Sequence, residues 1–471
     1  MNNDLLKKTK IVATIGPASR EVSVLTKMIH AGLNTVRMNF SHGSHEDHLD
    51  TITQVKKAQK KAKKPVAILQ DLSGPKIRIG DVQEGTVLAE GKPFVITTTS
   101  CTGDENRASV KFKPIVKAVS KGSVIKIDDG KISLRVIRVE GNDIHTTVLV
   151  GGPLSSNKGV NLPDITLPIS SLTAKDKKDV LFGIEHDVDY IALSFVQTAK
   201  DIRDLRKILA KHTCQAKIIA KIETTAAIEN LDEILEAADG AMVARGDMAV
   251  EIGVERVPMI QKSIIRKCNH LGKPVITATQ MLDSMEKNPT PTRAEVSDVA
   301  NAIIDGTDAI MLSSESAVGK YPVESIATMS AIAIRTELYT KNARLDYVGE
   351  PLDIVDTMTV SSVRIANNVR ARLIIPLTES GFTAQMIARF KPHHKIVAIT
   401  PRKKTFNQLQ LVYGCNPVLS DIKGDIKELS GNIRKIVIKE KLARKGEKVV
   451  VTMGAPFGEP GSTNTVFVIE I

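Results

Sequence analysis

Short apolar runs alternate with amphipathic stretches over the first two-thirds of the chain. Eight runs have the length and the continuous hydrophobicity of strands buried on both faces. They occupy residues 10–16, 34–40, 66–72, 188–195, 217–223, 240–247, 274–279 and 309–315. Helical periodicity follows most of them, at residues 20–31, 44–62, 198–211, 224–238, 254–271, 292–304 and 322–338. Eight strand–helix units predict an α/β fold built on a TIM (β/α)₈ barrel, covering residues 1–71 and 170–341.

The third unit is interrupted after Asp71, and the pattern resumes near Leu172. The insert alternates polar and apolar residues at period two and has turn residues between its runs, which is typical of β-structure. We expect a small β-barrel domain at 72–169, carried on hinges at Gly74-Pro75 and at 162–168. An insert at the catalytic end of the third strand is expected to act as a mobile lid that excludes water. An inert decoration is the alternative.

A second alternating pattern begins at about residue 342. It predicts a separate C-terminal α/β domain at 342–471. Its expected strands are 372–378, 395–401, 448–454 and 466–471, and its expected helices are 353–370, 382–391, 405–413 and 424–444.

Polar residues gather where the apolar runs of the barrel end. The carboxyl ends of parallel barrel strands meet at one rim, so residues from six strands are expected to converge there. Such convergence is a stronger signal than any single motif. The residues are Arg37, Asn39, Ser41, Asp71, Lys221, Glu223, Asp247, Thr279, Ser313 and Glu315.

Lys221 and Glu223 are the most informative pair at this rim. Alternation along a strand points both side chains to one side, and the run 240–247 brings Asp247 to the same end of the next strand. A cation beside two carboxylates suits a site for Mg²⁺ and phosphate, in which Lys221 neutralises charge on a phosphoryl group in transfer. A structural network of ion pairs is the alternative.

Two further residues fit this chemistry. Arg37 offers a planar fork for a phosphate. Gly246 permits close approach of the backbone, so that its N–H and that of Asp247 can bind a carboxylate.

Composition narrows the possible partners. The chain has 471 residues, enough for roughly three domains, and no apolar run long enough to span a membrane. Its first ten residues lack the apolar region of a signal peptide, and its four cysteines are scattered, which predicts a cytoplasmic protein with reduced thiols. The formal charge of +12 fits nucleic acid or small polyanionic substrates. Aromatic residues make up only 3% of the chain, and the basic run 56–64 has the character of a solvated helix face, so no nucleic-acid partner is expected.

Several longer motifs, in order along essentially the whole chain, resemble those of the pyruvate kinase family. They are TVRMNFSHGSHEDH, QDLSGPKIRIG, NKGVNLP, AKIET, MVARGDMAVEI, ITATQMLDSM, PTRAEVSDVANAIIDGTDAIMLSSESAVGKYP and GSTNT. The pairing of NPTPTRAE with MVARGD is the most specific. The resemblance implies phosphoryl transfer from phosphoenolpyruvate to ADP, giving pyruvate and ATP, in a homotetramer regulated through the C-terminal domain.

The resemblance also implies roles for individual residues. Lys221 would stabilise the transition state, Arg37 would bind the substrate's phosphate, and Glu223 and Asp247 would ligate Mg²⁺, for which Mn²⁺ can substitute. The remaining assignments are Gly246, Asp247 and Thr279 at the substrate's carboxylate end, Asn39, Ser41, His42, Arg78 and Lys158 beside the nucleotide, and Thr279 with Ser313 and Glu315 near the chain of waters that delivers the final proton.

The chain departs from the family at the start of the insert. Many members read DTKGPEIR and need K⁺, bound by groups that match Asn39, Ser41, Asp71 and the following residue, here Leu72. This chain has Lys76 where glutamate is usual. A fixed ammonium near the substrate can replace the alkali cation electrostatically, so K⁺ is predicted to be dispensable.

Thr378, Ser380 and Thr383 stand between a predicted strand and a predicted helix of the C-terminal domain. Hydroxyls and N–H groups at a helix start make an anion site, although a plain helix cap is the alternative. In relatives the matching loop holds an effector phosphate together with the segment matching 454–461. A sugar phosphate or AMP is the expected effector.

Other interpretations remain open at this level. An enolate-forming lyase barrel would use Mg²⁺ without a nucleotide, and a barrel that has lost activity could bind RNA through its basic surface. His42, His45 and His48 have helical spacing, and a solvated helix start is expected there rather than a metal site.

Overall fold

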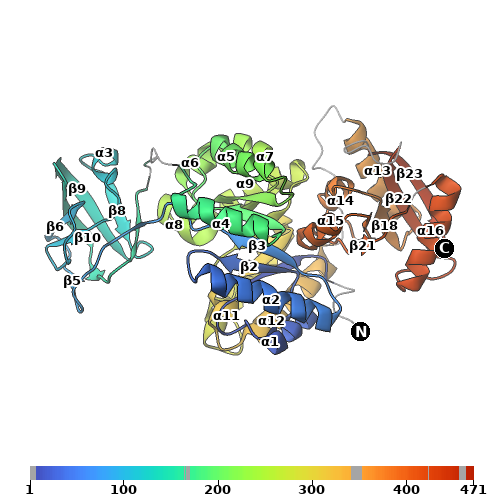
Figure 1. Cartoon of the computed structure of the whole chain (residues 1–471), viewed down its shortest axis with the longest axis horizontal. Helices are drawn as coiled ribbons and strands as arrows, with labels where there is room; N and C mark the ends of the chain where they lie inside the picture. The colour runs from blue at the N-terminus through green and yellow to red at the C-terminus, as the bar shows by residue number, and fades with distance from the viewer. Residues whose placement is uncertain (1–6, 164, 166–169, 341–352, 423, 456–462) are drawn as a thin grey trace.

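The computed structural model describes residues 7–163, 165, 170–340, 353–422, 424–455 and 463–471. Figure 1 shows three bodies in a row: the insert at one end, the barrel in the middle and the C-terminal α/β unit at the other end. No helix in these ranges is long and apolar enough to cross a membrane.

The eight expected barrel strands form a closed parallel barrel, in which each strand pairs with the next one along the chain and β17 closes on β1. The strands are β1 (Lys10–Thr14), β2 (Thr35–Asn39), β3 (Ala67–Asp71), β13 (Tyr190–Leu193), β14 (Lys217–Ile222), β15 (Gly240–Ala244), β16 (Val275–Ala278) and β17 (Ala309–Leu312). The predicted TIM barrel is therefore confirmed.

The helices of the barrel unit are α1 (Val22–Ala31), α2 (His45–Ala62), α4 (Ala174–Glu185), α5 (Ala199–Lys211), α6 (Thr225–Glu229), α7 (Leu231–Ala237), α8 (Arg245–Ile252), α9 (Val257–His270), α10 (Arg293–Asp305), α11 (Ser314–Ala317) and α12 (Pro322–Tyr339). The elements expected at 224–238 and 240–247 were wrong in detail. The helix expected at 224–238 is divided at Asn230, a residue type that favours helix ends. The strand expected at 240–247 ends at Ala244, and Arg245 begins the short helix α8, which has Asp247 in its first turn.

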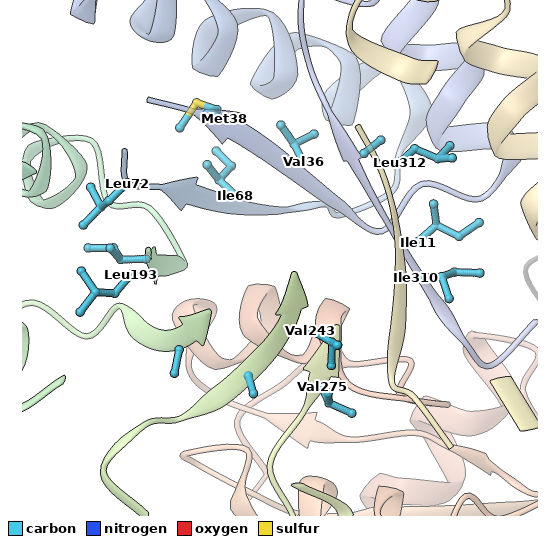
Figure 2. Close-up of a cluster of buried hydrophobic side chains, with 14 of the residues drawn as sticks. Ile11, Val36, Met38, Ile68, Leu72, Leu193, Val243, Val275, Ile310 and Leu312 are labelled. Carbon is cyan, nitrogen blue, oxygen red and sulfur yellow. The ribbon is translucent and has the colours of Figure 1, made fainter. Parts of the chain in front are cut away.

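The barrel strands are apolar on both faces, as continuous hydrophobic runs require. Ile11, Ile310 and Leu312 belong to the larger core between strands and helices, seen in Figure 2. Their neighbours Val12 and Met311 point into the barrel and belong to a second, inner core. Alternation along each strand therefore fills two separate cores from one run.

The insert is a seven-stranded sheet with its own core, which includes Phe94 and Leu134. In sheet order its strands are β4 (Ile77–Arg78), β12 (Gly159–Asn161), β8 (Val124–Ile127), β9 (Ile132–Glu140), β10 (Asp143–Val150), β6 (Pro93–Thr97) and β7 (Arg107–Ser109). The ribbon β5 (Val87–Leu88) with β11 (Gly152–Pro153) and helix α3 (Ile115–Ala118) complete it.

The two edges of this sheet meet. A bridge joins Ile79, which follows the first strand, to Val110, which follows the last, and Gly80 N–H donates to Ser109 O at 2.7 Å. Gly80 permits this approach because a Cβ there would lie 2.3 Å from Ser109 Oγ. The sheet therefore curls towards a barrel, in agreement with the β-barrel predicted for the insert. The proposed hinge at 162–168 lies partly outside the described residues.

The C-terminal unit has a four-stranded sheet in the order β19-β18-β22-β23 and a two-stranded sheet of β20 and β21. The strands are β18 (Leu373–Pro376), β19 (Lys395–Ile396), β20 (Ile399–Thr400), β21 (Val418–Leu419), β22 (Lys448–Gly454) and β23 (Thr463–Glu470). The helices are α13 (Ile354–Asn368), α14 (Phe382–Ala388), α15 (Lys403–Gln408) and α16 (Ile426–Lys439), and a 3₁₀ turn, η4 (Leu409–Leu411), follows α15. The strand expected at 395–401 is thus two short strands, and the helix expected at 405–413 ends at Gln408.

The C-terminal unit packs against the end of the barrel where the strands begin. Leu411 joins the inner barrel core, and the hydroxyl of Tyr190 at the start of β13 donates to Gln408 O at 2.6 Å. Lys391 forms an ion pair with Asp308 at 2.9 Å, just before β17. The insert leaves the barrel after β3, at the opposite end. The insert and the C-terminal unit therefore lie at different ends of the barrel.

Candidate active site

Lys221 and Glu223 lie together at the carboxyl end of β14. The Nζ atom of Lys221 is 3.4 Å from Glu223 Oε2 and 3.5 Å from Asp71 Oδ1, and it donates to Ser194 Oγ at 2.7 Å. The ammonium is therefore held between two carboxylates from β3 and β14, on the rim that alternation along the strands predicted.

Arg37 extends this group from β2. Its Nε atom lies 2.6 Å from Asp71 Oδ2, and its Nη1 donates to Thr14 Oγ1 at 2.8 Å. The side chain of Asp71 is only 1% exposed, so its charge is stable there only with these partners. Burial opposes ionisation, but the charges of Lys221 and Arg37 hold the pKa of Asp71 below its ordinary value. Burial also opposes the charge of Lys221, and Asp71 and Glu223 raise its pKa nonetheless.

Glu223 is the least satisfied member of the group. Its Oε1 accepts the N–H of Phe195 at 2.7 Å, but its fully buried Oε2 has no hydrogen-bond donor in the part of the chain that the structure describes. Burial and the neighbouring charges of Asp247 and Asp71 raise the pKa of Glu223, and Lys221 offsets only part of this. A buried carboxylate oxygen without a donor, near a second carboxylate, is an arrangement that a divalent cation would stabilise.

Asp247 reaches the site from the first turn of α8 rather than from a strand end. Its Oδ1 lies 3.1 Å from the Nζ of Lys76, which belongs to the segment leading into the insert. Gly246, one residue earlier, donates its N–H to Thr279 Oγ1 at 2.9 Å. The first N–H groups of a helix have no partners within the helix, so this turn presents donors of the kind that bind a carboxylate.

Thr279 follows β16 with a positive φ of 70°, which a β-branched residue rarely adopts. Arg245 maintains this conformation: its guanidinium donates to the carbonyls of Ala278 (3.2 Å) and Thr279 (2.5 Å), and it pairs with Asp298 at 2.7 Å. No role for Arg245 was expected from the sequence. The available signal was an arginine inside an otherwise apolar run.

Ser194 was also missed. It follows β13, donates to Leu72 O at 2.6 Å and accepts from Lys221. A serine that ends the apolar run 188–195 was the signal, and it would have made the fourth strand a contributor to the rim.

Ser313 and Glu315 lie beyond the end of β17, which finishes at Leu312 rather than at 315. Glu315 is 1% exposed, and its carboxylate accepts the N–H groups of Leu282 (3.1 Å) and Ser313 (2.7 Å). Burial raises its pKa. The structure thus shows Glu315 bracing two loops of the rim.

The residues expected beside the nucleotide lie on both sides of the joint between barrel and insert. Asn39 Oδ1 accepts the N–H of Ser41 at 3.1 Å, and Ser41 and His42 are exposed. On the insert, Arg78 donates to Asn157 O at 3.0 Å and Lys158 pairs with Asp128 at 2.9 Å. Their side chains are engaged locally, and reaching a nucleotide would require them to exchange these partners.

A pocket lies beside α2, lined among others by Pro17, Arg20, Asp50 and Gln54. None of these residues was expected at the site from the sequence.

The three histidines near α2 do not converge on one point. His45 pairs with Asp179 at 2.8 Å, and the ring of His48 stacks on Phe40 with centroids 3.9 Å apart and bonds to His42 O. In the described residues no group of three or more His, Cys, Asp or Glu is placed to hold a metal ion. The expectation of a helix start is confirmed by the capping box of Ser44 and Asp47, but His48 is buried rather than solvated.

The groups expected around a monovalent cation already have partners within the protein. Asp71 is engaged by Arg37 and Lys221, and the carbonyl of Leu72 accepts from Ser194. The ammonium of Lys76 lies nearby, on Asp247.

The insert contacts α8 directly. Lys126 Nζ donates to Val250 O at 2.6 Å, and Asn161 Nδ2 donates to Glu251 Oε1 at 3.2 Å. With Lys76 on Asp247, three contacts connect the insert to the helix that presents Asp247. A pocket between the two units is lined by Lys76, Asn161 and Glu251 among others.

In the C-terminal unit, Thr378 Oγ1 accepts the N–H of Gly381 at 3.0 Å, and Ser380 Oγ accepts that of Phe382 at 3.4 Å. Thr383 is buried and bonds to Thr463 at 2.8 Å. Helix α14 begins at Phe382 without a side-chain cap at its N-cap, Gly381. Ser380 alone of the three hydroxyl residues is exposed. Most of the partner segment 454–461 lies outside the described residues.

Comparison with known proteins agrees with this geometry. The family model described as pyruvate kinase, barrel domain, matches residues 6–326, and the one described as pyruvate kinase, alpha/beta domain, matches residues 356–469. A pyruvate kinase from Staphylococcus epidermidis is 43% identical over 98% of this chain and 80% of its own length. One from Geobacillus stearothermophilus is 45% identical over 97% of this chain and 79% of its own length.

A solved structure of a pyruvate kinase from Cryptosporidium parvum superposes with a TM-score of 0.92 at 34% identity, covering 100% of this chain and 97% of that one. The chain therefore belongs to the pyruvate kinase family, whose reaction moves the phosphoryl group of phosphoenolpyruvate to ADP and leaves pyruvate in the last step of glycolysis.

Proposed function

We propose that the rim around Lys221 is the place where this chain carries out that transfer. The observation that supports the proposal is the position of the Lys221 ammonium, 3.5 Å from Asp71 and 3.4 Å from Glu223, with Arg37 on the other oxygen of Asp71. A fixed cation in a mostly buried site can stabilise negative charge that develops on a phosphoryl group without reorganisation.

Glu223 and Asp247 would hold Mg²⁺, or Mn²⁺ in its place. The buried Oε2 of Glu223 lacks a donor among the described residues, and the charge of Asp247 contributes to the raised pKa of Glu223, so the residues present fit a divalent ion. When bound, such an ion neutralises charge on the phosphoryl and carboxylate oxygens of the substrate.

The protein's own groups have separable roles. Arg37 would bind the phosphate of phosphoenolpyruvate, and the N–H groups of Gly246 and Asp247 at the start of α8 would bind its carboxylate. For this, the N–H of Gly246 would have to exchange its bond to Thr279 Oγ1 for one to the substrate. Thr279 lies against Gly246 at 2.9 Å, so its hydroxyl would stand beside the three-carbon unit, near the path of the final proton. Ser313 and Glu315 would lie near the same path, and the carboxylate of Glu315 would hold Ser313 in place by accepting its N–H.

Asn39, Ser41 and His42 would border the nucleotide on the barrel side, and Arg78 and Lys158 would approach its phosphates from the insert. This assignment requires the insert to move as a lid. The proposed domains are the barrel at 1–71 and 170–341, the insert at 72–169 and the C-terminal unit at 342–471. The contacts of Lys126 and Asn161 with α8 support it because they connect the insert to the helix that carries Asp247.

We also propose that K⁺ is dispensable. The ammonium of Lys76, 3.1 Å from Asp247, supplies a fixed positive charge at the site, while Asn39, Ser41, Asp71 and Leu72 have other partners.

Regulation is proposed to act through the C-terminal unit, with a sugar phosphate or AMP as the effector at Thr378, Ser380 and Thr383. The protein is proposed to be a cytoplasmic homotetramer. Four free cysteines are consistent with a reducing compartment.

The direct experiment is pyruvate formation from phosphoenolpyruvate, with ADP, Mg²⁺ and K⁺ each omitted in turn. Turnover that needs ADP and Mg²⁺ but not K⁺ is the expected result. Pyruvate release without ADP would indicate a lyase or phosphatase instead, and an unchanged half-saturating phosphoenolpyruvate concentration with a panel of sugar phosphates and AMP would remove the effector proposal.

A further inference from the structure

The loop at residues 40–44 connects the end of β2 to the start of α2. It carries Ser41 and His42, which the proposed function places beside the nucleotide, and both side chains are exposed. A short connecting loop needs contacts from the elements around it to keep such groups in one position. Several of these contacts come from α4, the helix that follows the insert along the chain.

One stripe of α4 faces this loop. Lys175, Asp179 and Phe182 have the spacing i, i+4, i+7, which places them on the same side of a helix. The Nζ of Lys175 donates to Phe40 O at 2.6 Å, and the rings of Phe182 and Phe40 have centroids 5.6 Å apart. Asp179 Oδ1 lies 2.8 Å from Nε2 of His45, the first residue of α2. The stripe therefore contacts both ends of the loop.

The peptide group between Phe40 and Ser41 is held at both of its polar atoms. Its carbonyl accepts from Lys175, and its N–H donates to Asn39 Oδ1 at 3.1 Å. Phe40 is buried, and its ring stacks on that of His48. Because the side chain of Ser41 starts from this fixed peptide group, the contact with Lys175 helps to determine where Ser41 lies.

Asp179 distinguishes this arrangement from an exposed ion pair, which contributes little to stability. Its side chain is only 3% exposed and lies between Lys175, at 2.6 Å, and His45, at 2.8 Å. A buried carboxylate charge is stable only with such partners. Asp179 therefore holds the ammonium of Lys175 in the position from which it reaches Phe40 O.

The first turn of α4 also contacts the place where the insert leaves the barrel. Asp176, which is fully buried, accepts the N–H of Gly74 at 3.1 Å and forms the capping box of α4 with Thr173. Gly74 has a φ of 67°, and a Cβ there would lie 2.8 Å from Phe195 Cδ2, so glycine suits this position. The start of α4 thus contacts both the loop at 40–44 and the hinge at Gly74.

We propose that Lys175 and Asp179 are positioning residues for the nucleotide, which act through Phe40 and His45 and do not touch the substrates. This inference rests on the proposed function, in which the loop at 40–44 borders ADP. Without the ammonium of Lys175, the peptide group after Phe40 is free to rotate, and the exposed side chains of the loop sample more positions. ADP must then order the loop when it binds, which lowers its affinity. Phosphoenolpyruvate should be affected less, because its proposed binding residues lie outside the loop.

The test uses the full chain and measures ADP binding in the presence of Mg²⁺ by titration calorimetry. Lys175→Met removes the charge and both hydrogen bonds, whereas Lys175→Arg can still donate to both acceptors. Asp179→Asn keeps the shape of the side chain and removes its charge. Lys178→Met is the matched control, because Lys178 is an exposed lysine of the same helix. Calorimetry needs no turnover, so a chain that binds ADP without forming pyruvate would contradict the proposed function and not this inference.

Lys175→Met is expected to weaken ADP binding about tenfold, the scale of one charge-assisted hydrogen bond. The KM for ADP should rise by the same factor, with little change in the KM for phosphoenolpyruvate. Asp179→Asn should shift both quantities in the same direction, Lys175→Arg should restore most of the affinity, and Lys178→Met should bind ADP as the wild type does. Unchanged ADP affinity in Lys175→Met, or an equal loss for both substrates, would overturn the proposal.

Hydrogen exchange gives a readout that is independent of the substrates. In Lys175→Met the amides of residues 40–44 should exchange about tenfold faster than in the wild type, because the lost bond restrains them. The amides of residues 72–78 should exchange as in the wild type, because Asp176 keeps its bond to Gly74. Unchanged exchange in the loop would contradict the proposal. Faster exchange along the whole of α4 would also contradict it, since the helix itself would then be destabilised.

Discussion

The Nζ atom of Lys76 lies 3.1 Å from Oδ1 of Asp247, across the joint between the insert and the barrel. The proposal that K⁺ is dispensable depends on this fixed charge. Lys76→Glu should reduce turnover in K⁺-free buffer by about tenfold, the scale of one charge interaction near 4 Å, and added K⁺ should restore part of it. The wild type should respond less than twofold to K⁺. A strong K⁺ requirement in the wild type would show that Lys76 does not replace the cation.

Lys221 tests the assignment of the active site. Replacing it with Met removes the cation beside Asp71 and Glu223, and kcat should fall by at least about a hundredfold, as for other fixed electrostatic groups. Lys217→Met is the matched control, because it removes a lysine from the opposite end of the same strand, β14. Steady-state kinetics would compare kcat of the two variants with that of the wild type, and circular dichroism would check that both variants are folded. Equal losses in the two variants would indicate general damage to the strand.

Arg245 should act on the reaction through Thr279 without touching substrate. Arg245→Lys keeps the charge but cannot donate to the carbonyls of Ala278 and Thr279 while pairing with Asp298. We expect kcat/KM for phosphoenolpyruvate to fall about a hundredfold, the effect of a displacement of about 1 Å in a catalytic group, with a smaller change in KM for ADP. If both substrates lose affinity equally, Arg245 is only structural.

The contacts between the insert and α8 should assist closure over the substrates. Lys126→Met removes the bond to Val250 O, and Lys131→Met serves as control because Lys131 is exposed and pairs only within the insert, with Asp128. A lost charge-assisted hydrogen bond corresponds to a fall of about tenfold in kcat/KM for ADP. Resonance energy transfer between a label on the insert and one on the barrel should report a larger average distance between the two units in Lys126→Met than in the wild type. An unchanged distance with unchanged kinetics would argue against a role in closure.

Asp189 offers a test of pH dependence. Burial raises its pKa to about 6, although Lys404 and the N–H of Ile68 oppose the shift, and its Oδ1 has no hydrogen-bond donor. The unfolded chain loses this proton near pH 4, so the folded state binds the proton more tightly and stability falls as pH rises from about 4 to 6. Above pH 6 the full penalty remains, on the order of 3 kcal/mol.

Asp189→Asn should therefore be more stable than wild type at pH 7.5, by urea unfolding, and the difference should shrink towards pH 4.5. A variant that is less stable at both values would show that the ion pair with Lys404 outweighs the burial of the carboxylate.

Much of the site could be predicted because strands impose simple geometry. The period of two along a strand placed Lys221 and Glu223 on one side. Because all barrel strands run in the same direction, Arg37, Asp71 and Thr279 were expected on the same rim. Ser194 and Arg245 escaped because their roles consist of bonds to distant backbone carbonyls, which no local pattern records. The residues next to Glu315 in the sequence do not show whether its carboxylate faces water or accepts the N–H of Leu282. Its burial could therefore not be predicted.

The sequence by itself determined the order of strands and helices, the insert after Asp71, the separate C-terminal unit and the end of the barrel at which polar residues gather. It could do so because hydrophobic periodicity is a property of neighbouring residues. The tertiary structure alone decided that Asp247 comes from the first turn of a helix, that Lys76 crosses to meet it, and that Lys175 on α4 reaches the carbonyl of Phe40. Such contacts join residues far apart along the chain, and their energies depend on burial and on which charges are left unpaired once the whole chain has packed.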